Sequence, residues 1–227
     1  MTMPFYVPPE QLVKDRADFA RKGISRGRPI AVLQIDDGVL MIGENSSPSL
    51  RKIGEIYDRI AFAGVGRFNE FETLRVAGVR YADLKGFSYA RSDVTGRGLA
   101  NAYSQTLGQI FSHEVKPYEV DIIVAEVGAT REDDSLFRIG FDGTLRTAEG
   151  VAVLGAEEDE ITEELLGART DGMGLDNAII AACSAIRSAS DHDIGDAEWE
   201  AGFLERGADR RAFRRVSRDE INAARNG

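Results

Sequence analysis

The side chains that most often carry catalysis are scarce in this sequence, which has two histidines, His113 and His192, and one cysteine, Cys183. A histidine can act as a general base or bind a metal ion, but neither one lies in a motif with a partner. His192 stands between two aspartates in the run SDHDIGD, yet adjacent loop residues seldom converge on one ion. We therefore expect His192 to be an exposed loop residue, and we expect no metal site.

The remaining catalytic and cofactor patterns are also missing. Cys183 lies in an alanine-rich helical pattern, where a thiol serves as a small buried apolar group. No G-x-S-x-G turn is present to hold a catalytic serine. Gly64 and Gly66 begin a dinucleotide-binding pattern, but Asn69 stands where its third glycine belongs, and the Walker motif is absent. The sequence thus contains no self-contained active site, and we expect no cofactor.

Charge and hydropathy narrow the classes of protein further. The 227 residues include 28 Lys and Arg against 38 Asp and Glu, a net charge of −10, which disfavours binding to nucleic acid because phosphate neutralisation dominates that affinity. No apolar run reaches the roughly 18 residues of a membrane-spanning helix, and the start lacks the pattern of a secretory signal. We expect a cytoplasmic protein with no affinity for membranes or nucleic acid.

Runs rich in β-branched residues and bounded by turn residues predict strands. The clearest is a hairpin of 30–35 and 39–43 around Asp36-Asp37-Gly38. Residues 120–127 are apolar at every second position on both faces, which indicates a strand that is covered on both sides. Further strands are expected at 53–57, 60–65, 136–139, 144–147, 151–154, 199–204 and 212–216.

Helices are expected between these groups of strands. One helix should begin at Pro9, which suits a first turn, and end at residue 22, because Gly23 is a typical residue just past a helix end. Runs of strands followed by runs of helices favour an α+β fold of two antiparallel sheets, stacked face to face with helices outside. The other helices are expected at 71–82, at 99–110 with Asp93 or Thr95 as its cap, and at 161–167, 175–188 and 218–225.

Two segments concentrate charge of opposite sign. Residues 156–164 carry six acidic side chains, and residues 206–218 carry six arginines. Such runs are either solvated faces or complementary surfaces through which subunits of an oligomer meet.

The first half of the chain resembles a known family. The stretches ARKGISRGRPIAVLQIDDGVLMIGEN and SLRKIGEIYDRIAFAGVGRFNEFETLR resemble the α subunit of the proteasome core particle, most closely its bacterial type. DVTGRGLANAYSQTLGQIF and KPYEVDIIVAEVG extend the resemblance to about residue 128. It implies the four-layer αββα sandwich of the amino-terminal-nucleophile hydrolase fold. The chain would form a single domain over 1–227, with a gating segment at 1–8, a helix at 9–22 and the sandwich at 23–227.

The wider family includes β subunits. In these, the catalytic threonine is the first residue of the first strand, and a lysine near the end of the second strand adjusts the pKa of this nucleophile. Matching the DGV turn places Arg28 at the threonine position and Asn45 at the lysine position, while Glu44 keeps an acidic position. A guanidinium is no nucleophile, and an amide cannot lower a neighbouring pKa. The resemblance thus implies a subunit of a threonine-type endopeptidase complex with no catalytic residues of its own. The alternatives are an active peptidase or amidase of this fold, and an oligomeric binding module.

The resemblance also implies partners. Subunits of this type form seven-membered outer rings on two β rings, and the helix 9–22 would pack against neighbouring α subunits. Lys52 matches the lysine that receives the C-terminal carboxylate of an activating AAA+ ATPase ring, and Gly27 either lines the same pocket or is a loop glycine before a strand. The apolar start would close the pore to unfolded protein substrates until the activator docks. The gate residues are Thr2, Met3, Pro4, Phe5, Tyr6, Val7 and Pro8.

Overall fold

Two five-stranded antiparallel sheets form the centre of the computed structural model, which describes residues 8–47, 49–168 and 172–226. The predicted hairpin joins β1 to β2, with Ile35 paired to Gly38 across the turn. The first sheet, in order across it, consists of β10 (Phe213–Val216), β9 (Trp199–Glu205), β2 (Gly38–Glu44), β1 (Ile30–Ile35) and β8 (Val151–Leu154). The second consists of β3 (Ile53–Tyr57), β4 (Ile60–Gly66), β5 (Val120–Glu126), β6 (Ser135–Ile139) and β7 (Leu145–Ala148).

The two sheets stack because their central strands are apolar on both faces. In β1, Leu33 and Ile35 belong to one hydrophobic cluster with helical residues, whereas Ile30 and Val32 belong to a second cluster with strand residues of the other sheet. The side chains of β5, the middle strand of the second sheet, alternate in the same way. One set belongs to the cluster between the sheets, and the other belongs to a third cluster, which the helices on this sheet cover. Side chains that alternate across a strand thus fill two cores at once.

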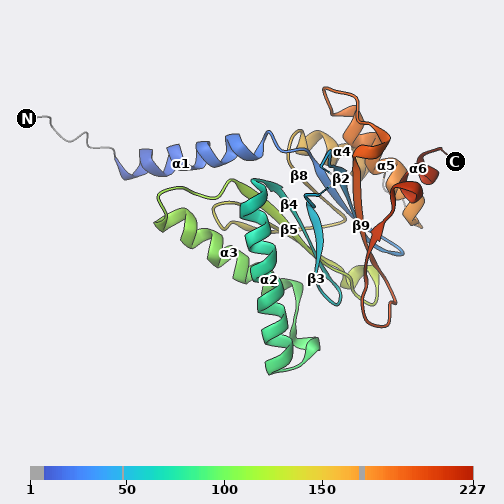
Figure 1. The fold of residues 1–227 in the computed structure, drawn as a ribbon, viewed down its shortest axis with the longest axis horizontal. Coiled ribbons are helices and arrows are strands. Elements are labelled where there is room, and N and C mark those ends of the chain that lie inside the picture. Colours follow the sequence, from blue (N-terminus) through green and yellow to red (C-terminus); the bar gives the residue numbers. More distant parts are fainter. Residues whose placement is uncertain (1–7, 48, 169–171, 227) are drawn as a thin grey trace, which may run out of the picture.

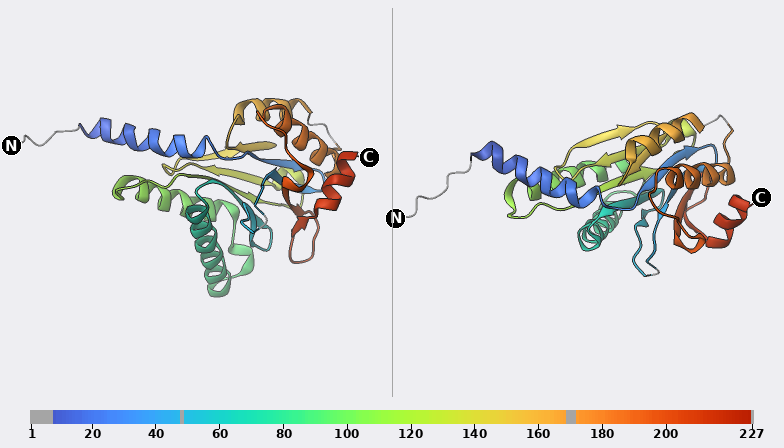
Figure 2. Two further views of the ribbon diagram at one scale, coloured as in Figure 1. Left: turned by 45° about the horizontal axis from the view of Figure 1, so that its top comes forward. Right: turned by 90° about the horizontal axis from the view of Figure 1, so that it is seen from above.

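Helices cover both outer faces, which gives the predicted αββα layers (Figure 1, Figure 2). The second sheet carries α2 and α3, and the first carries α4, α5 and α6. Thr95, one of the two predicted caps, accepts a hydrogen bond from the Gly98 amide at the start of α3. No helix within the described ranges is both long and apolar enough to span a membrane. The helices of these layers are α2 (Phe68–Ser88), α3 (Gly96–His113), α4 (Glu158–Ala168), α5 (Leu175–Ser188) and α6 (Arg218–Asn226), with short 3-10 turns at Arg91–Asp93, Arg131–Asp133 and Asp196–Glu198.

The first helix, α1 (Pro9–Ile24), projects away from the sandwich (Figure 1). Only its last turns are packed, with Ala20 and Ile24 against Phe141. The predicted end at residue 22 is wrong, because Gly23 continues the helix. A β-carbon at Gly23 would lie 2.2 Å from a carboxylate oxygen of Glu119, at the far end of a flexible side chain that would have to shift.

Candidate functional site

Lys52 and Gly27 lie close together at the end of the sandwich where β2 ends and β1 and β3 begin. The Lys52 ammonium donates a hydrogen bond to the carbonyl oxygen of Glu44, the last residue of β2, at 3.0 Å. It donates a second one, at 3.4 Å, to the carbonyl oxygen of Arg28, which directly follows Gly27. The fold thus brings together the two residues that the sequence suggested for one pocket.

The Lys52 side chain is half-buried, and this changes its chemistry. Burial lowers the pKa of its ammonium from 10.5 to about 8, while the carboxylates of Glu44 and Glu200 oppose the shift and the Arg28 guanidinium adds to it. An ammonium has three N–H donors, and the two carbonyl oxygens take two of them. Among the described residues none accepts the third, so the group can donate to a carboxylate that arrives from outside.

Glu200, on β9, fixes the backbone on which Lys52 stands. Its buried carboxylate accepts hydrogen bonds from the amides of Lys52 at 3.1 Å and Ile53 at 3.3 Å. The Asn45 side chain donates to it at 2.5 Å, and the Arg215 guanidinium at 3.2 Å. Sequence reasoning missed Glu200, whose only signal was a charged residue inside the otherwise apolar run WEAGFL.

Gly27 is required by packing. A β-carbon there would lie 2.2 Å from a methyl carbon of Val65 on β4 and 2.9 Å from the carbonyl oxygen of Ile24. The Gly27 amide donates to that same carbonyl oxygen at 2.8 Å, and its own carbonyl oxygen accepts from the Ala156 amide at 3.0 Å. This contact explains a glycine before the strand, and its place in a binding pocket stays a prediction.

Arg28, which matches the position of the catalytic threonine in β subunits, lies in a cluster of charged side chains. Its Nε lies 3.1 Å from Oε1 of the buried Glu44, and His192 Nε2 lies 3.1 Å from the same oxygen. Asp191 contacts the other ring nitrogen of His192 at 3.0 Å. Hydrogen bonds to Asp191 and then Glu44 raise the pKa of His192 above its usual value.

His192 lies in a loop, as predicted, but it is only partly exposed. Its side chain is 30% exposed and contacts Glu44, 148 positions earlier in the sequence. No group of three or more potential metal-binding side chains occurs in the part of the chain that the structure describes. The cluster is better suited to holding the start of β1 than to chemistry, because Arg28 and His192 both contact one buried carboxylate.

Cys183 is buried in α5, as the alanine-rich pattern predicted. Burial raises the pKa of its thiol to about 12. Since the thiolate is the reactive form of cysteine, this side chain serves packing.

The predicted gate residues Thr2, Met3, Pro4, Phe5, Tyr6 and Val7 lie outside the described residues. Pro8 is exposed and immediately precedes α1, where its carbonyl oxygen accepts a hydrogen bond from the Leu12 amide at 3.1 Å.

Comparison with known proteins agrees with this fold. The family model described as proteasome subunit matches residues 24–201. The chain is 50% identical over 222 residues to a protein of Thermomonospora curvata named proteasome subunit alpha, a match that covers 97% of this chain and 96% of the relative. It is 51% identical to the protein of the same name in Xylanimonas cellulosilytica, a match that covers 95% of this chain and 93% of the relative. It is 52% identical to the protein of the same name in Acidothermus cellulolyticus, a match that covers 95% of this chain and 94% of the relative.

Proposed function

The chain belongs to the proteasome subunit family, as an α subunit, and we propose that it forms the outer rings of the core particle, gates substrate entry and docks an ATPase activator. In this proposal the α rings are seven-membered and cap two rings of β subunits. Unfolded proteins pass through their pore, and the C-terminal tails of an AAA+ ATPase ring bind between neighbouring α subunits.

The absence of a catalytic role is supported by the start of β1. The residue at the threonine position is Arg28, whose guanidinium is held by Glu44 and has no nucleophilic lone pair. The helix α1 precedes it, so no free terminal amine lies at the strand start. We expect the intact mass of the chain, isolated from assembled particles, to show no cleavage ahead of Arg28. Processing to a Thr, Ser or Cys would instead support the alternative of an active amino-terminal hydrolase.

Docking of the activator is carried by one observation, the half-buried Lys52 ammonium with an N–H that no described residue accepts. A carboxylate at the end of a peptide chain would accept that N–H and form a charge-assisted hydrogen bond. Gly27 lies beside this ammonium, but its missing side chain is explained by packing against Val65, so Lys52 alone supports the docking proposal.

Contacts within the α ring are supported by α1. Leu12, Val13 and Phe19 are 51%, 53% and 48% exposed on a helix that leaves the body of the subunit (Figure 2). Apolar side chains in such a position are typical of a surface that a neighbouring subunit covers. At the ring mouth, α1 would then hold the gate residues that precede it.

The substitution Lys52→Ala tests this function in assembled particles. We expect it to abolish ATPase-stimulated protein degradation, because the tail carboxylate loses its partner, and to leave hydrolysis of small peptides nearly intact. Lys85→Ala, which removes a lysine from α2, is the matched control and should change neither rate. Equal loss of both activities in Lys52→Ala would contradict docking at this lysine.

A further inference from the structure

Two pockets of opposite charge lie at opposite edges of the sandwich. β7 and β8 are the edge strands on one side, and β3 and β10 are the edge strands on the other. A pocket of about 530 Å³ lies beside β7 and the end of β8, and we name its lining the acidic edge. A second pocket, of about 690 Å³, lies beside β3 and β10, and we name its lining, with the adjoining start of α6, the basic edge.

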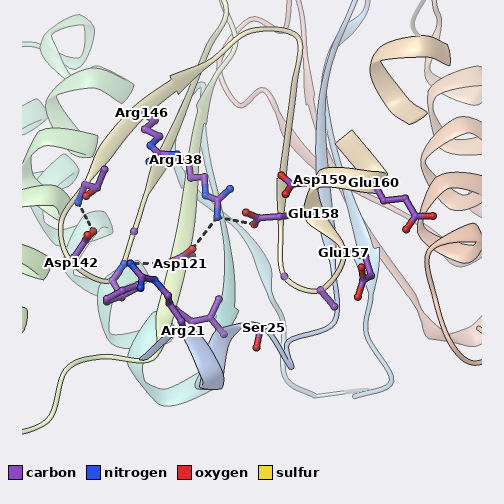
Figure 3. Close-up of a pocket in the computed structure, with 16 residues that line it drawn as sticks. Arg21, Ser25, Asp121, Arg138, Asp142, Arg146, Glu157, Glu158, Asp159 and Glu160 are labelled. Carbon is purple, nitrogen blue, oxygen red and sulfur yellow. Dashed lines mark hydrogen bonds and ion pairs between the residues drawn. The ribbon is translucent and has the colours of Figure 1, made fainter. Parts of the chain in front are cut away.

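The acidic edge holds six carboxylates and three arginines. Its inner part is neutralised within the chain, since Arg138 contacts Asp121 at 3.2 Å and Glu158 at 2.7 Å. Figure 3 shows this triad at the centre, with Glu157 and the acids at the start of α4 on one side of the pocket. The outer acids have no ion-pair partner among the described residues and are exposed; they are Glu157, Asp159 and Glu160.

The backbone of the acidic edge is strained at Glu157. With a φ of 52°, Glu157 is the one non-glycine residue with a left-handed backbone in the described ranges. L-residues other than asparagine and aspartate seldom adopt this conformation, and residues held in it cluster where a surface has a function. The turn at Glu157, which leads into the first residues of α4 and their exposed acids, is therefore built at a conformational cost.

The basic edge has the complementary composition. Its main pocket is lined by five arginines and two glutamates, and its inner part is also neutralised within the chain, since four of these arginines form ion pairs with glutamates of the same subunit. Arg51, which lines this pocket and the adjoining one, is exposed and has no ion-pair partner among the described residues. Arg218 is also exposed and unpaired within those ranges, although it opens α6, where the helix dipole disfavours a cation. Neither side chain is explained by contacts within the subunit.

We propose that the acidic edge of one α subunit docks on the basic edge of the next, so that charge complementarity sets the register of the α ring. The proposal rests on the proposed function, in which this chain forms such a ring. A contact between two different surfaces of one chain is head-to-tail, which is the geometry that closes a ring. Complementary charges fix the register of such an interface and reject wrong pairings.

Two further observations favour a second copy as the occupant. Arg21 and Ile24, at the base of α1, line the acidic edge, so the exposed apolar face of α1 leaves the subunit where the same neighbour would sit. The net charge of −10 opposes binding of a nucleic acid at the basic edge, whereas another copy supplies the required acids itself.

Charge reversal on each edge tests the proposal. One variant carries Asp159→Lys and Glu160→Lys, and a second carries Arg51→Glu and Arg218→Glu; neither breaks an ion pair within the described subunit. A third variant carries all four changes in one chain, which restores opposite charges at every interface whatever the number of subunits. The control carries Glu163→Lys and Glu164→Lys, exposed acids of the same helix that do not line the pocket.

The readout is native mass and sedimentation of each variant co-expressed with its β subunit, with thermal unfolding as the check on folding. We expect each single-edge reversal to lower the assembled fraction about tenfold, because like charges then face each other in every interface. The fourfold variant should return to within about twofold of the wild type, and the control should match the wild type.

The outcomes distinguish a failure of the proposed function from a failure of edge-to-edge docking. A wild-type chain that forms no ring with its β subunit overturns the proposed function and this inference together. A wild type that assembles while both single-edge reversals also assemble overturns the inference alone. Failure of the fourfold variant to recover would equally contradict edge-to-edge docking, because a folded chain with all charges exchanged should pair with itself.

Discussion

Raising the pH from 7 to 9 should weaken the docking of a carboxylate-terminated tail on the α subunit. The reason is the Lys52 ammonium, whose pKa burial lowers to about 8 while the Glu44 and Glu200 carboxylates partly oppose the shift. An exposed lysine with a pKa of 10.5 would stay charged over this whole range. Docking at Lys52 therefore predicts a pH dependence that an ordinary surface lysine would not produce.

The size of the effect follows from the protonated fraction of Lys52. With a pKa of about 8, that fraction is about 0.9 at pH 7 and about 0.1 at pH 9. If only the ammonium form binds the carboxylate, affinity falls about tenfold over this range. A bound carboxylate stabilises the ammonium and so raises the pKa of Lys52. Near pH 8, where part of the free Lys52 is neutral, binding of the tail should therefore be accompanied by proton uptake.

Fluorescence anisotropy of a labelled peptide with the C-terminal residues of the ATPase, titrated with assembled core particle, measures this affinity directly. Ionic strength is held constant, because salt screens the same interaction. The variant Lys52→Arg keeps its charge at every pH in the range, so its affinity should not change between pH 7 and 9. Lys52→Ala should bind weakly throughout.

Equal wild-type affinity at pH 7 and pH 9 would refute the role given to the Lys52 ammonium. A parallel decline in Lys52→Arg would refute it too, because another group would then be titrating. His192, which contacts Glu44 and whose pKa is raised by hydrogen bonds to Asp191 and Glu44, is the group to test. His192→Gln should therefore keep the wild-type profile if Lys52 is responsible.

Three further outcomes are expected. Deleting residues 2–8 should raise basal peptide hydrolysis by assembled particles, and an unchanged rate would mean that this segment is not the gate. Arg206→Ala should lower the free energy of unfolding by about 3 kcal/mol in urea denaturation, because it leaves the buried Asp134 carboxylate and three backbone carbonyl oxygens without the guanidinium that donates to them; a loss below about 1 kcal/mol would count against this explanation. Cys183, with a pKa of about 12, should resist thiol reagents at pH 8 in the folded subunit and react fully in denaturant, so rapid labelling of folded protein would contradict its burial.

The layers of the fold could be predicted because strand burial leaves a direct mark on the sequence. β1, β2 and β5 are apolar almost throughout, which only a strand covered on both faces requires. The end of α1 could not be predicted in this way. Gly23 has the local character of a helix stop, but α1 continues to Ile24, which is buried against Phe141, and that contact between distant residues leaves no local mark on the sequence.

Part of the site could also be predicted. The β1–β2 hairpin pairs Ile30 with Gly43, and continuing that register towards the open end brings Arg28 beside Glu44 and Asn45. The remaining partners come from β9 and the loop before it. Glu200 and His192 each lie about 150 positions away from the residues they contact, and no local pattern indicates such a distance.

These distant partners decide whether Lys52 can receive a carboxylate from another protein. The two carboxylates that act most strongly on its pKa are Glu44 and Glu200, and neither forms an ion pair with it in the described structure. Glu44 is engaged by Arg28 and His192, and Glu200 by backbone amides, Asn45 and Arg215. The Lys52 ammonium instead contacts two carbonyl oxygens, which position it without neutralising it. A tail carboxylate therefore meets a charged group and displaces no existing ion pair, so removing Arg215, which does not act on the pKa of Lys52, should weaken docking by freeing Glu200 as an internal competitor for Lys52.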